Sequence, residues 1–340
     1  MVTRIEIAAF IAELKRGVPL FDVRSPKEFN FGHMPGAISF PLLNDDERHE
    51  VGITYKNEGH DAAVKLGFRL VGHKFINYIE AAQMHAVDGA VCLYCWRGGL
   101  RSNTMAWLLS SVGLKVYVLE GGYKRFRNWC LDEFRHEWPL VVLSGRTGAG
   151  KTEVLQALKL EGGVVIDLEK LASHRGSAFG ALGLPNQPTQ EDFENTLAWH
   201  LGDQHGASQI WVENESRFIG RLRIPDDFFI QMKKRPMVTI DRDLTHRAER
   251  VISEYGNFDR AALAEKTQGI TKRMGGDRVK VSLTALEAGD MIGWVLPLLD
   301  YYDRNYDHSI QQREGKYERI ITVREETVTQ LADLLLTMKF

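Results

Sequence analysis

The stretch LYCWRGGLRS, residues 93–102, decides how the first half of the chain folds. The apolar run AVCLY leads into Cys95, and a loop containing Gly98 and Gly99 follows before a helical pattern starts at Ser102. Glycines let backbone N–H groups turn inward around an anion, and the start of a helix adds partial positive charge. The stretch therefore predicts a thiol at the base of an anion-binding loop.

The arginines of this loop can supply further donors to the anion. Cysteine attacks as its thiolate, which positive surroundings favour, so we expect Cys95 to be the catalytic nucleophile. The groups expected to hold the anion are Arg97, Gly98, Gly99 and Arg101.

The cysteines also bear on the compartment. Cys92, Cys95 and Cys130 are too few for a disulfide framework in 340 residues. The sequence shows no signal peptide and no apolar run long enough to span a bilayer. We therefore expect reduced thiols, a cytoplasmic protein and no membrane partner. The C-x-x-C pair lacks the other ligands of a zinc site, so we predict that Cys92 is a buried strand residue.

Strand patterns alternate with helical patterns outward from the loop, which predicts an α/β fold with mostly parallel sheets. At 340 residues, 44% hydrophobic and 26% charged, the chain is long enough for two soluble domains. We expect domains at residues 1–130 and 139–340, joined by a linker at 131–138. The expected first helix starts with a capping box at Thr3–Glu6. Other helices are expected at about 61–85, 102–112 and from Gly122, with strands at 19–23, 90–94 and 115–120.

A second phosphate-type loop, GRTGAGKT at residues 145–152, lies between the apolar strand LVVLS and the helical segment EVLQALKL. The pattern G-x-x-x-x-G-K-T in this context indicates a P-loop, which wraps a diphosphate with backbone N–H groups. ATP or GTP is the usual ligand, although the motif itself specifies only a polyphosphate. The residues expected to bind the diphosphate are Gly145, Thr147, Gly148, Gly150, Lys151 and Thr152.

Carboxylates at neighbouring strand ends often complete the metal site of a P-loop. We expect Mg²⁺ on Thr152 together with either Asp167 or Glu213, and no tightly bound cofactor. The segments HRGSAFG and ENESRFIG also follow strand ends, where open α/β sheets bind ligands. The residues singled out there for substrate binding are His174, Arg175, Ser177, Glu213, Glu215 and Arg217.

The segments DVRSPKEF and GHMPGA, taken with the Cys95 loop, resemble the rhodanese fold over about residues 5–130. This resemblance implies a persulfide, or its selenium analogue, on Cys95. The polar residues to which it gives structural roles are Asp22, Arg24 and His33.

A rhodanese-like domain followed by a P-loop NTPase-like α/β domain, with HRGSAFG and ENESRFIG, resembles the tRNA 2-selenouridine synthase family over nearly the whole chain. The resemblance implies a tRNA whose wobble uridine carries sulfur at C2. That sulfur is alkylated by geranyl diphosphate, and selenophosphate then gives 2-selenouridine. The implied partners are tRNA and a selenophosphate-supplying synthetase, without DNA. Either Cys95 carries the selenium or its loop holds selenophosphate at the tRNA.

Other functions fit parts of the pattern. A sulfurtransferase fused to an ATP-dependent kinase or adenylating module would need ATP turnover, whereas the leading hypothesis needs none. A tRNA-binding scaffold with an inactive rhodanese half would not need the intact Cys95, Gly98 and Arg101. The spacing C-x5-R also occurs in cysteine phosphatases, but those normally carry His where this chain has Tyr94. The net charge of −2 indicates no broad nucleic-acid-binding field, so tRNA would need a local basic face.

Overall fold

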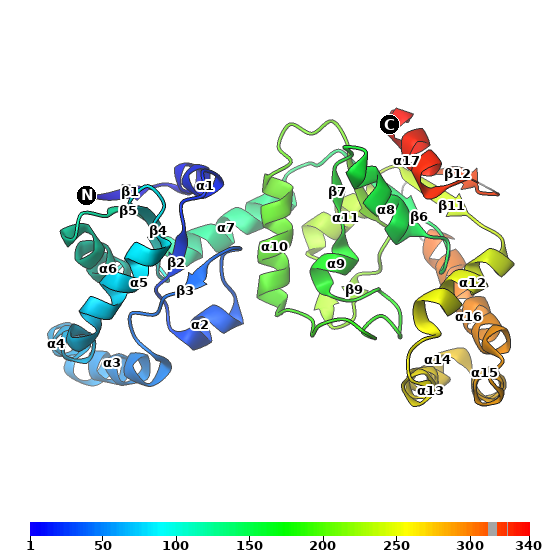
Figure 1. Ribbon diagram of the computed structural model, residues 1–340, viewed down its shortest axis with the longest axis horizontal. Coiled ribbons are helices and arrows are strands. Elements are labelled where there is room, and N and C mark those ends of the chain that lie inside the picture. Colours follow the sequence, from blue (N-terminus) through cyan, green and yellow to red (C-terminus); the bar gives the residue numbers. More distant parts are fainter. Residues whose placement is uncertain (312–317, 325) are drawn as a thin grey trace. The chain divides into compact units, whose positions relative to one another are not determined.

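The computed structural model of the chain describes residues 1–311, 318–324 and 326–340. It forms two compact units (Figure 1). The first unit contains Met1–Glu133 and Thr189–Trp199, and the second contains Phe134–Pro188 and His200–Phe340. Each unit has its own five-stranded parallel sheet, which confirms the predicted α/β class.

The sheet of the first unit has the strand order β1-β5-β4-β2-β3, and all its neighbours are parallel. The strands are β1 (Val2–Ile5), β2 (Leu20–Asp22), β3 (Ile38–Ser39), β4 (Ala90–Tyr94) and β5 (Lys115–Leu119). The α-helices are α1 (Ile7–Lys15), α2 (Pro26–Phe31), α3 (Asp45–Glu58), α4 (His60–Val71), α5 (Phe75–His85), α6 (Leu100–Ser111) and α7 (Gly122–Arg135). A 3₁₀ turn, η1 (Gly72–Lys74), joins α4 to α5.

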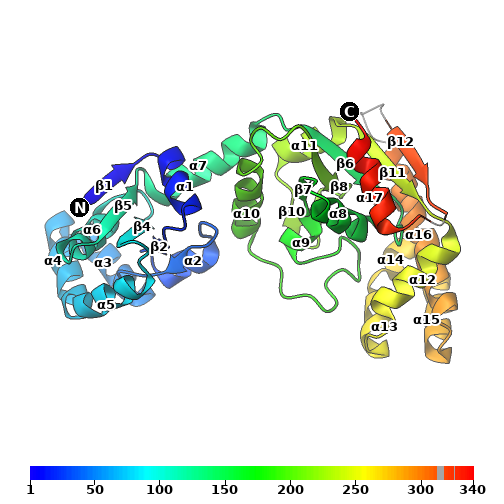
Figure 2. The same ribbon diagram turned by 45° about the horizontal axis from the view of Figure 1, so that its top comes forward.

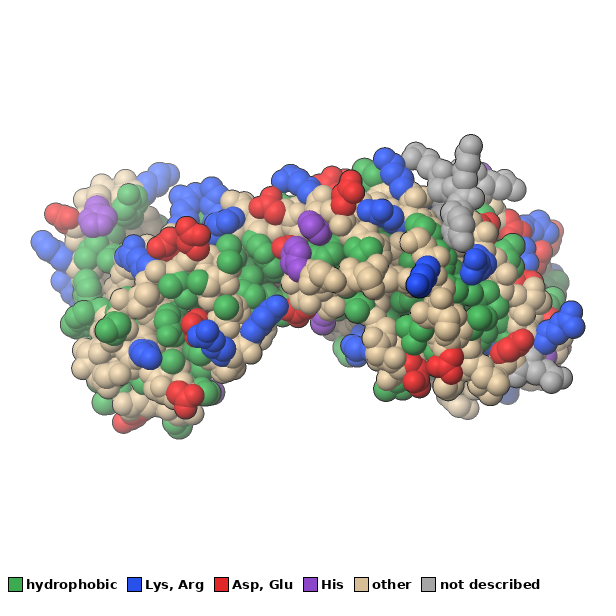
Figure 3. All heavy atoms as spheres, turned by 90° about the horizontal axis from the view of Figure 1, so that it is seen from above, with side chains coloured by type: hydrophobic (Ala, Val, Ile, Leu, Met, Phe, Trp, Pro, Cys, Tyr) green, Lys and Arg blue, Asp and Glu red, His purple; other side chains and the backbone are tan. Residues whose placement is uncertain are grey.

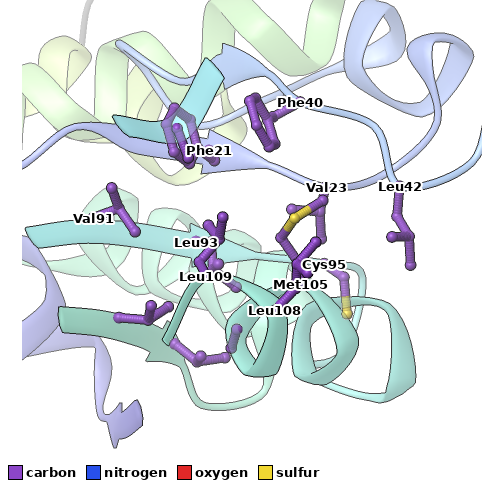
Figure 4. Close-up of a cluster of buried hydrophobic side chains, with 14 of the residues drawn as sticks. Phe21, Val23, Phe40, Leu42, Val91, Leu93, Cys95, Met105, Leu108 and Leu109 are labelled. Atoms are coloured by element: carbon purple, nitrogen blue, oxygen red, sulfur yellow. The ribbon is translucent and has the colours of Figure 1, made fainter. Parts of the chain in front are cut away.

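The alternation of side chains along β4 separates the two cysteines of the C-x-x-C pair. Val91, Leu93 and Cys95 belong to one core cluster together with residues of α6 (Figure 4). Cys92 lies at an even position of the strand and so points to the opposite face. It is fully buried, and burial raises the pKa of its thiol to about 12. The prediction of a buried strand residue at Cys92 is confirmed.

Two sequence-based expectations for the first unit differ from the structure. The segment Thr3–Glu6 opens no helix with a capping box: Thr3–Ile5 lies in β1, and Glu6 precedes α1 without a side-chain cap. Helix α3 was not expected, because it buries none of its residues and so lacks a clear apolar stripe. Helix α7 continues to Arg135, so the first residues of the expected linker at 131–138 are helical.

The sheet of the second unit has the order β12-β11-β6-β8-β7, and it is also parallel. Its strands are β6 (Leu140–Ser144), β7 (Val165–Ile166), β8 (Ile210–Glu213), β11 (Met237–Asp241) and β12 (Glu318–Thr322), and a small antiparallel pair is formed by β9 (Phe218–Ile219) and β10 (Leu222–Arg223). The helices are α8 (Lys151–Leu160), α9 (Leu168–Ala172), α11 (Asp226–Lys234), α12 (Leu244–Tyr255), α13 (Arg260–Gly269), α14 (Thr271–Met274), α15 (Gly276–Ala288), α16 (Met291–Gln311) and α17 (Val328–Thr337).

Two apolar clusters stabilise the second unit. One packs α8 and α17 against the sheet, around Leu158 and Leu335. The other packs α12, α13, α15 and α16 against one another, and these helices lie together beyond the sheet in Figure 2. The aromatic centre of the second cluster is Trp294, which is 1% exposed.

Helix α10 (Gln190–Gly202) belongs to both units of the chain. Its residues up to Trp199 pack with the first unit, although they follow the P-loop in the sequence. Within the parts of the chain that the structure covers, none of the helices combines the length and apolarity needed to cross a bilayer. On the face drawn in Figure 3, basic and acidic side chains are interspersed, in keeping with the small net charge.

Candidate active sites

The thiol of Cys95 lies directly after β4, at the base of the loop that leads into α6. It is 3% exposed, and its Sγ is 3.2 Å from the hydroxyl of Ser102. That hydroxyl donates to the carbonyl oxygen of Gly99 at 3.0 Å. Gly98, which has φ of 69°, and Gly99 connect the cysteine to the first turn of α6, whose Ser102 lies beside the sulfur. This arrangement presents backbone N–H groups and a helix start to an anion near Sγ.

The start of α7 holds the cysteine loop in place. The amide of Tyr123 donates to the carbonyl of Cys95 at 2.8 Å, and the amide of Lys124 donates to that of Trp96 at 3.0 Å. A Cβ at Gly122 would lie 2.3 Å from the carbonyl oxygen of Cys95. Only glycine can occupy that position without moving the loop.

The two arginines of the loop differ in their surroundings. Arg97 is exposed, whereas Arg101 makes two hydrogen bonds to Glu28, at 2.6 and 3.2 Å. Burial alone would raise the pKa of Glu28, but the hydrogen bond and charge of Arg101 hold it below its ordinary value. Arg101 therefore faces a carboxylate here, and an anion at the loop would have to compete with Glu28 for it.

The polar residues of the DVRSPKEF segment form a buried network beside the loop. Asp22 and Arg24 make an ion pair of 2.6 Å at 0% and 1% exposure. The Arg24 guanidinium also donates to the carbonyl of Gly32 at 2.6 Å and lies 3.8 Å from the ring centroid of Tyr123. Tyr94 donates to Asp22 at 2.8 Å. These contacts join β2, β4 and α7, which is a structural arrangement.

Helix α10 completes this side of the first unit. Asn195 is fully buried and donates to the carbonyl of His33 at 2.8 Å and to the hydroxyl of Tyr123 at 2.7 Å. It accepts from Arg127 at 2.5 Å. The backbone amide of His33 in turn donates to Asp192 at 2.9 Å. The helix is thereby linked through Tyr123 to the loop that carries the thiol.

The P-loop of the second unit runs from the end of β6 into α8. Gly148 has φ of 79°, and a Cβ there would lie 2.5 Å from the carbonyl oxygen of Arg247. Arg247 also donates to the carbonyl of Thr147 at 3.2 Å and to Asp303 at 2.8 Å. Helix α12 thus packs directly under the loop and fixes its curvature. The ammonium of Lys151 donates to the carbonyl of Gly145 at 2.9 Å.

Carboxylates gather beside the P-loop lysine. The Thr152 hydroxyl is 3.4 Å from Glu169, and the amide of Glu169 donates to Glu213 at 2.7 Å. Glu215 lies in the same group, because a Cβ at Gly176 would meet both Glu215 and Glu169. Burial raises the pKa of all three glutamates, and the neighbouring acid charges add to this effect.

The expected metal ligands are arranged differently from the sequence-based expectation. Asp167 caps α9 by accepting from the amide of Lys170 at 2.8 Å, and Glu213 is 3% exposed beneath Glu169. The carboxylate within hydrogen-bonding distance of the Thr152 hydroxyl is that of Glu169. Within residues 1–311, 318–324 and 326–340, no three His, Cys, Asp or Glu side chains form a set that could hold a metal ion.

A cavity of about 660 Å³ extends from the P-loop into the helices of the second unit. It is lined by the P-loop, by further polar residues that include Glu169, Glu254 and Arg250, and by apolar residues that belong to the core cluster of α12, α13, α15 and α16. The predicted residues that line it are Gly145, Thr147, Gly148, Gly150, Lys151, Thr152, Arg175, Ser177 and Glu215. The apolar lining residues are Phe179, Val251, Tyr255, Trp294, Val295, Leu298, Leu299 and Tyr302.

Besides Glu213, two residues of the predicted clusters lie outside the cavity lining. His174 is buried with its ring against Gly180 and Gly220, each of whose Cβ positions would lie 2.8 Å from it. Arg217 forms an ion pair with Asp226 at 2.9 Å on α11. Neither residue is among those that line the cavity.

Comparisons with known proteins cover both loops. Residues 138–285 match the family model of the tRNA 2-selenouridine synthase AAA domain, and residues 6–128 match that of the rhodanese-like domain. A tRNA 2-selenouridine synthase from Marinobacter nauticus is 35% identical over 98% of both chains. One from Pseudomonas syringae pv. tomato is 39% identical over 89% of this chain and 90% of its own. One from Bdellovibrio bacteriovorus is 45% identical over 71% of this chain and 65% of its own.

The chain belongs to the tRNA 2-selenouridine synthase family. It is therefore an enzyme, a selenium transferase, as the domain order and the two loops indicated.

Several residues around the synthase P-loop were not found from the sequence. Arg250 pairs with Glu153 and lies against Gly150, and Arg146 pairs with Asp307 at 2.9 Å. Arg250 and Asp307 come from α12 and α16, far along the chain, and no short motif marks them. Glu169 had a weak signal, because it follows the predicted strand end by three residues.

Proposed function

We propose that the enzyme forms 2-selenouridine at the wobble position of tRNA in two steps, with geranyl diphosphate and then selenophosphate as donors. In the first step, the 2-thiouridine sulfur attacks C1 of geranyl diphosphate. An S–C bond forms, the C–O bond breaks, diphosphate leaves and the N3 proton of the base is lost. This step raises the reactivity of the base, because an alkylated sulfur leaves C2 more readily than a thiocarbonyl sulfur.

The cavity of the second unit is the observation that carries this proposal. Its P-loop end offers backbone N–H groups and Lys151 to a diphosphate. Among the other lining residues, Trp294, Leu298 and Leu299 belong to one apolar cluster and so give part of the wall an apolar surface. An isoprenoid chain buries apolar surface on such a wall, whereas a nucleotide would place a polar ribose there. Geranyl diphosphate therefore matches both the polar and the apolar lining of the cavity.

The polar residues at the P-loop would act on the diphosphate leaving group. Lys151, released from the carbonyl of Gly145, can donate to the outer phosphate. Thr152 and Glu169 are the residues suited to hold Mg²⁺, because this ion binds few protein oxygens and completes its shell with phosphate and water. The metal would offset the charge on the diphosphate.

In the second step, the selenium of selenophosphate attacks C2 of the alkylated base. A C–Se bond forms, the C–S bond breaks and geranylthiol leaves. Water then cleaves the Se–P bond and releases phosphate. Selenium is already at the selenide level in this donor, so the displacement needs no oxidant, whereas a selenopersulfide on Cys95 would. The backbone of the Cys95 loop suits selenophosphate, and the exposed Trp96 beside it can stack on the uracil.

The partners follow from these substrates. The tRNA would be bound through its anticodon, and an enzyme that makes selenophosphate must supply the second donor. The wobble base must be unstacked to reach each loop, as in other enzymes that modify bases.

Nucleoside mass analysis of 2-thiouridine tRNA incubated with the purified enzyme tests the proposal. Geranyl diphosphate alone should give S-geranyl-2-thiouridine, and both donors together should give 2-selenouridine. We expect Lys151→Ala to block the first step and Cys95→Ser, which changes the group at the base of the anion loop, to slow only the second. Lys159→Ala, an exposed lysine in the last turn of α8, is the matched control and should retain both steps. ATP consumption without a change in the base would refute the proposal.

A further inference from the structure

The first unit contains its own apolar cavity, of about 440 Å³, beside the cysteine loop. Its walls come from α3, α4, the start of α6 and the loop before α3, and include Leu43, Val51, Val64, Phe68 and Leu100. This volume lies within the range of about 300–1,000 Å³ that is usual for small-molecule sites. Nothing in the role of the Cys95 loop as an anion site accounts for an apolar space next to it.

Two glycines keep this cavity open. Gly52 lies inside α3 and Gly67 inside α4, and both line the cavity. Neither has a positive φ, and a Cβ on either would meet no atom within 4 Å. Glycine weakens a helix interior, and neither backbone strain nor close packing requires it here. The empty space that they preserve therefore suits a ligand better than it suits the fold.

The cavity adjoins the reacting end of the loop. Leu100, Arg101 and Thr104 line it from the first turns of α6. The hydroxyl of Ser102, in the same turns, is 3.2 Å from Sγ of Cys95. Leu42, another lining residue, belongs to the core cluster that contains Cys95, and Figure 4 draws both toward the same end of that cluster. A group attached to a base at the loop can therefore extend into the cavity.

The charges of the cavity are confined to one end. Arg48 and Arg101 line it, and both contact Glu28, at 3.8 and 2.6 Å. The remaining walls offer aliphatic and aromatic surface, together with the Thr104 hydroxyl. The occupant is thus a chain that is apolar along its length and attached to something polar at one end.

We propose that this cavity binds the geranyl chain of the S-geranyl-2-thiouridine intermediate while C2 of the base reacts at the Cys95 loop. This inference rests on the proposed function and adds a second isoprenoid site to it, in the first unit. Binding the chain would hold the C–S bond that breaks next to the selenium donor. It would also favour the alkylated base over unmodified 2-thiouridine, which has no chain to bury.

The test uses the full-length enzyme, selenophosphate and anticodon stem-loop RNAs that carry either S-geranyl- or S-methyl-2-thiouridine. Both RNAs release an alkylthiolate, so their chemical reactivity is similar. A difference between their kcat/KM values therefore measures the effect of binding the geranyl chain. We expect the wild type to convert the S-geranyl RNA with a kcat/KM about a hundredfold higher, from the apolar surface of the longer chain. Gly52→Leu and Val64→Phe, which fill the cavity from α3 and α4, should lower this value at least tenfold.

Three controls make the result specific. Gly52→Ala adds one methyl group and favours the helix, so it should stay near the wild-type rate. Conversion of the S-methyl RNA should be unchanged in all variants. Geranylation of 2-thiouridine RNA, which is assigned to the P-loop unit, should be unchanged too.

Two results would overturn this inference without affecting the proposed function. In the first, the Gly52→Leu and Val64→Phe enzymes convert the S-geranyl RNA as fast as the wild type does. In the second, the wild type converts the S-geranyl and S-methyl RNAs equally well. A variant that loses geranylation as well would also contradict it. A wild type that forms neither S-geranyl-2-thiouridine nor 2-selenouridine would instead overturn the proposed function.

Discussion

Replacing Asn195 by alanine tests whether α10 is a working part of the rhodanese-like unit. The Asn195 side chain is fully buried and makes hydrogen bonds to His33, Tyr123 and Arg127, at 2.8, 2.7 and 2.5 Å. The alanine variant would leave all three partner groups without this bond in a buried setting. Each lost bond is worth about 1 kcal/mol, so docking of the helix should weaken by about 3 kcal/mol.

Hydrogen exchange followed by mass spectrometry measures this effect locally, which matters because two units need not unfold together. A change of about 3 kcal/mol corresponds to exchange on the order of a hundredfold faster in α10. The peptide that contains Tyr123 should also exchange faster, because this residue links α10 to the carbonyl of Cys95. Selenation of S-geranyl RNA should fall, while geranylation stays unchanged.

Thr196→Ala is the matched control, one residue further along the same helix. The Thr196 hydroxyl donates only within α10, to the carbonyl of Asp192 at 2.8 Å. Loss of this hydroxyl should change the free energy of opening that hydrogen exchange measures in α10 by less than about 0.5 kcal/mol. Equal exchange in the two variants would refute the reasoning, because it would mean that Asn195 does not hold the helix in place.

Three further predictions follow from the geometry. Gly122→Ala places a Cβ 2.3 Å from the carbonyl oxygen of Cys95, so selenation assayed on S-geranyl RNA should fall at least tenfold while geranylation remains. Arg24→Met leaves Asp22 charged and buried, and a denaturant titration should show a loss of about 3–5 kcal/mol in the unfolding free energy of the first unit. Burial holds the pKa of Glu213 well above its ordinary value of 4.5, so the folded state keeps a proton that the unfolded chain loses. Glu213 should then lower the unfolding free energy as the pH rises above 4.5, by up to about 1.4 kcal/mol per pH unit, in addition to the contributions of Glu169 and Glu215. Glu213→Gln should therefore reduce the slope measured in thermal melts.

The fold could be predicted where local sequence and tertiary structure agree. Buried parallel strands such as AVCLY and LVVLS are continuous apolar runs, and the glycine-rich loops after them carry their own backbone signal. The elements that were predicted wrongly or missed have physical explanations. Thr3–Ile5 forms an edge strand because it pairs with β5, which lies more than a hundred residues away. Helix α3 has little apolar periodicity, since it covers a cavity rather than a packed core.

The two candidate sites were accessible to sequence reasoning to different degrees. The residues proposed to bind the anions lie in short motifs, so Cys95 and Lys151 could be named with their neighbours. Their supporting groups come from distant segments: Glu28 opposite Arg101, and Asn195 behind Tyr123. A pairing of this kind depends on the tertiary fold, and one sequence carries no local trace of it. The apolar walls of both cavities could not be predicted either, because in the sequence an apolar residue that lines a cavity cannot be told from one in the core.

The presence of an apolar cavity beside each anion loop bears on why one chain carries both domains. If the isoprenoid served only to activate sulfur, its chain length would matter only where the diphosphate is displaced. A short alkyl group would then give an equally good leaving group in the second step. The energy of burying a ten-carbon chain can be used twice, however, if each loop has an apolar site next to it. The same chain then selects the donor in the first step and marks the activated base in the second, before it leaves as a thiol.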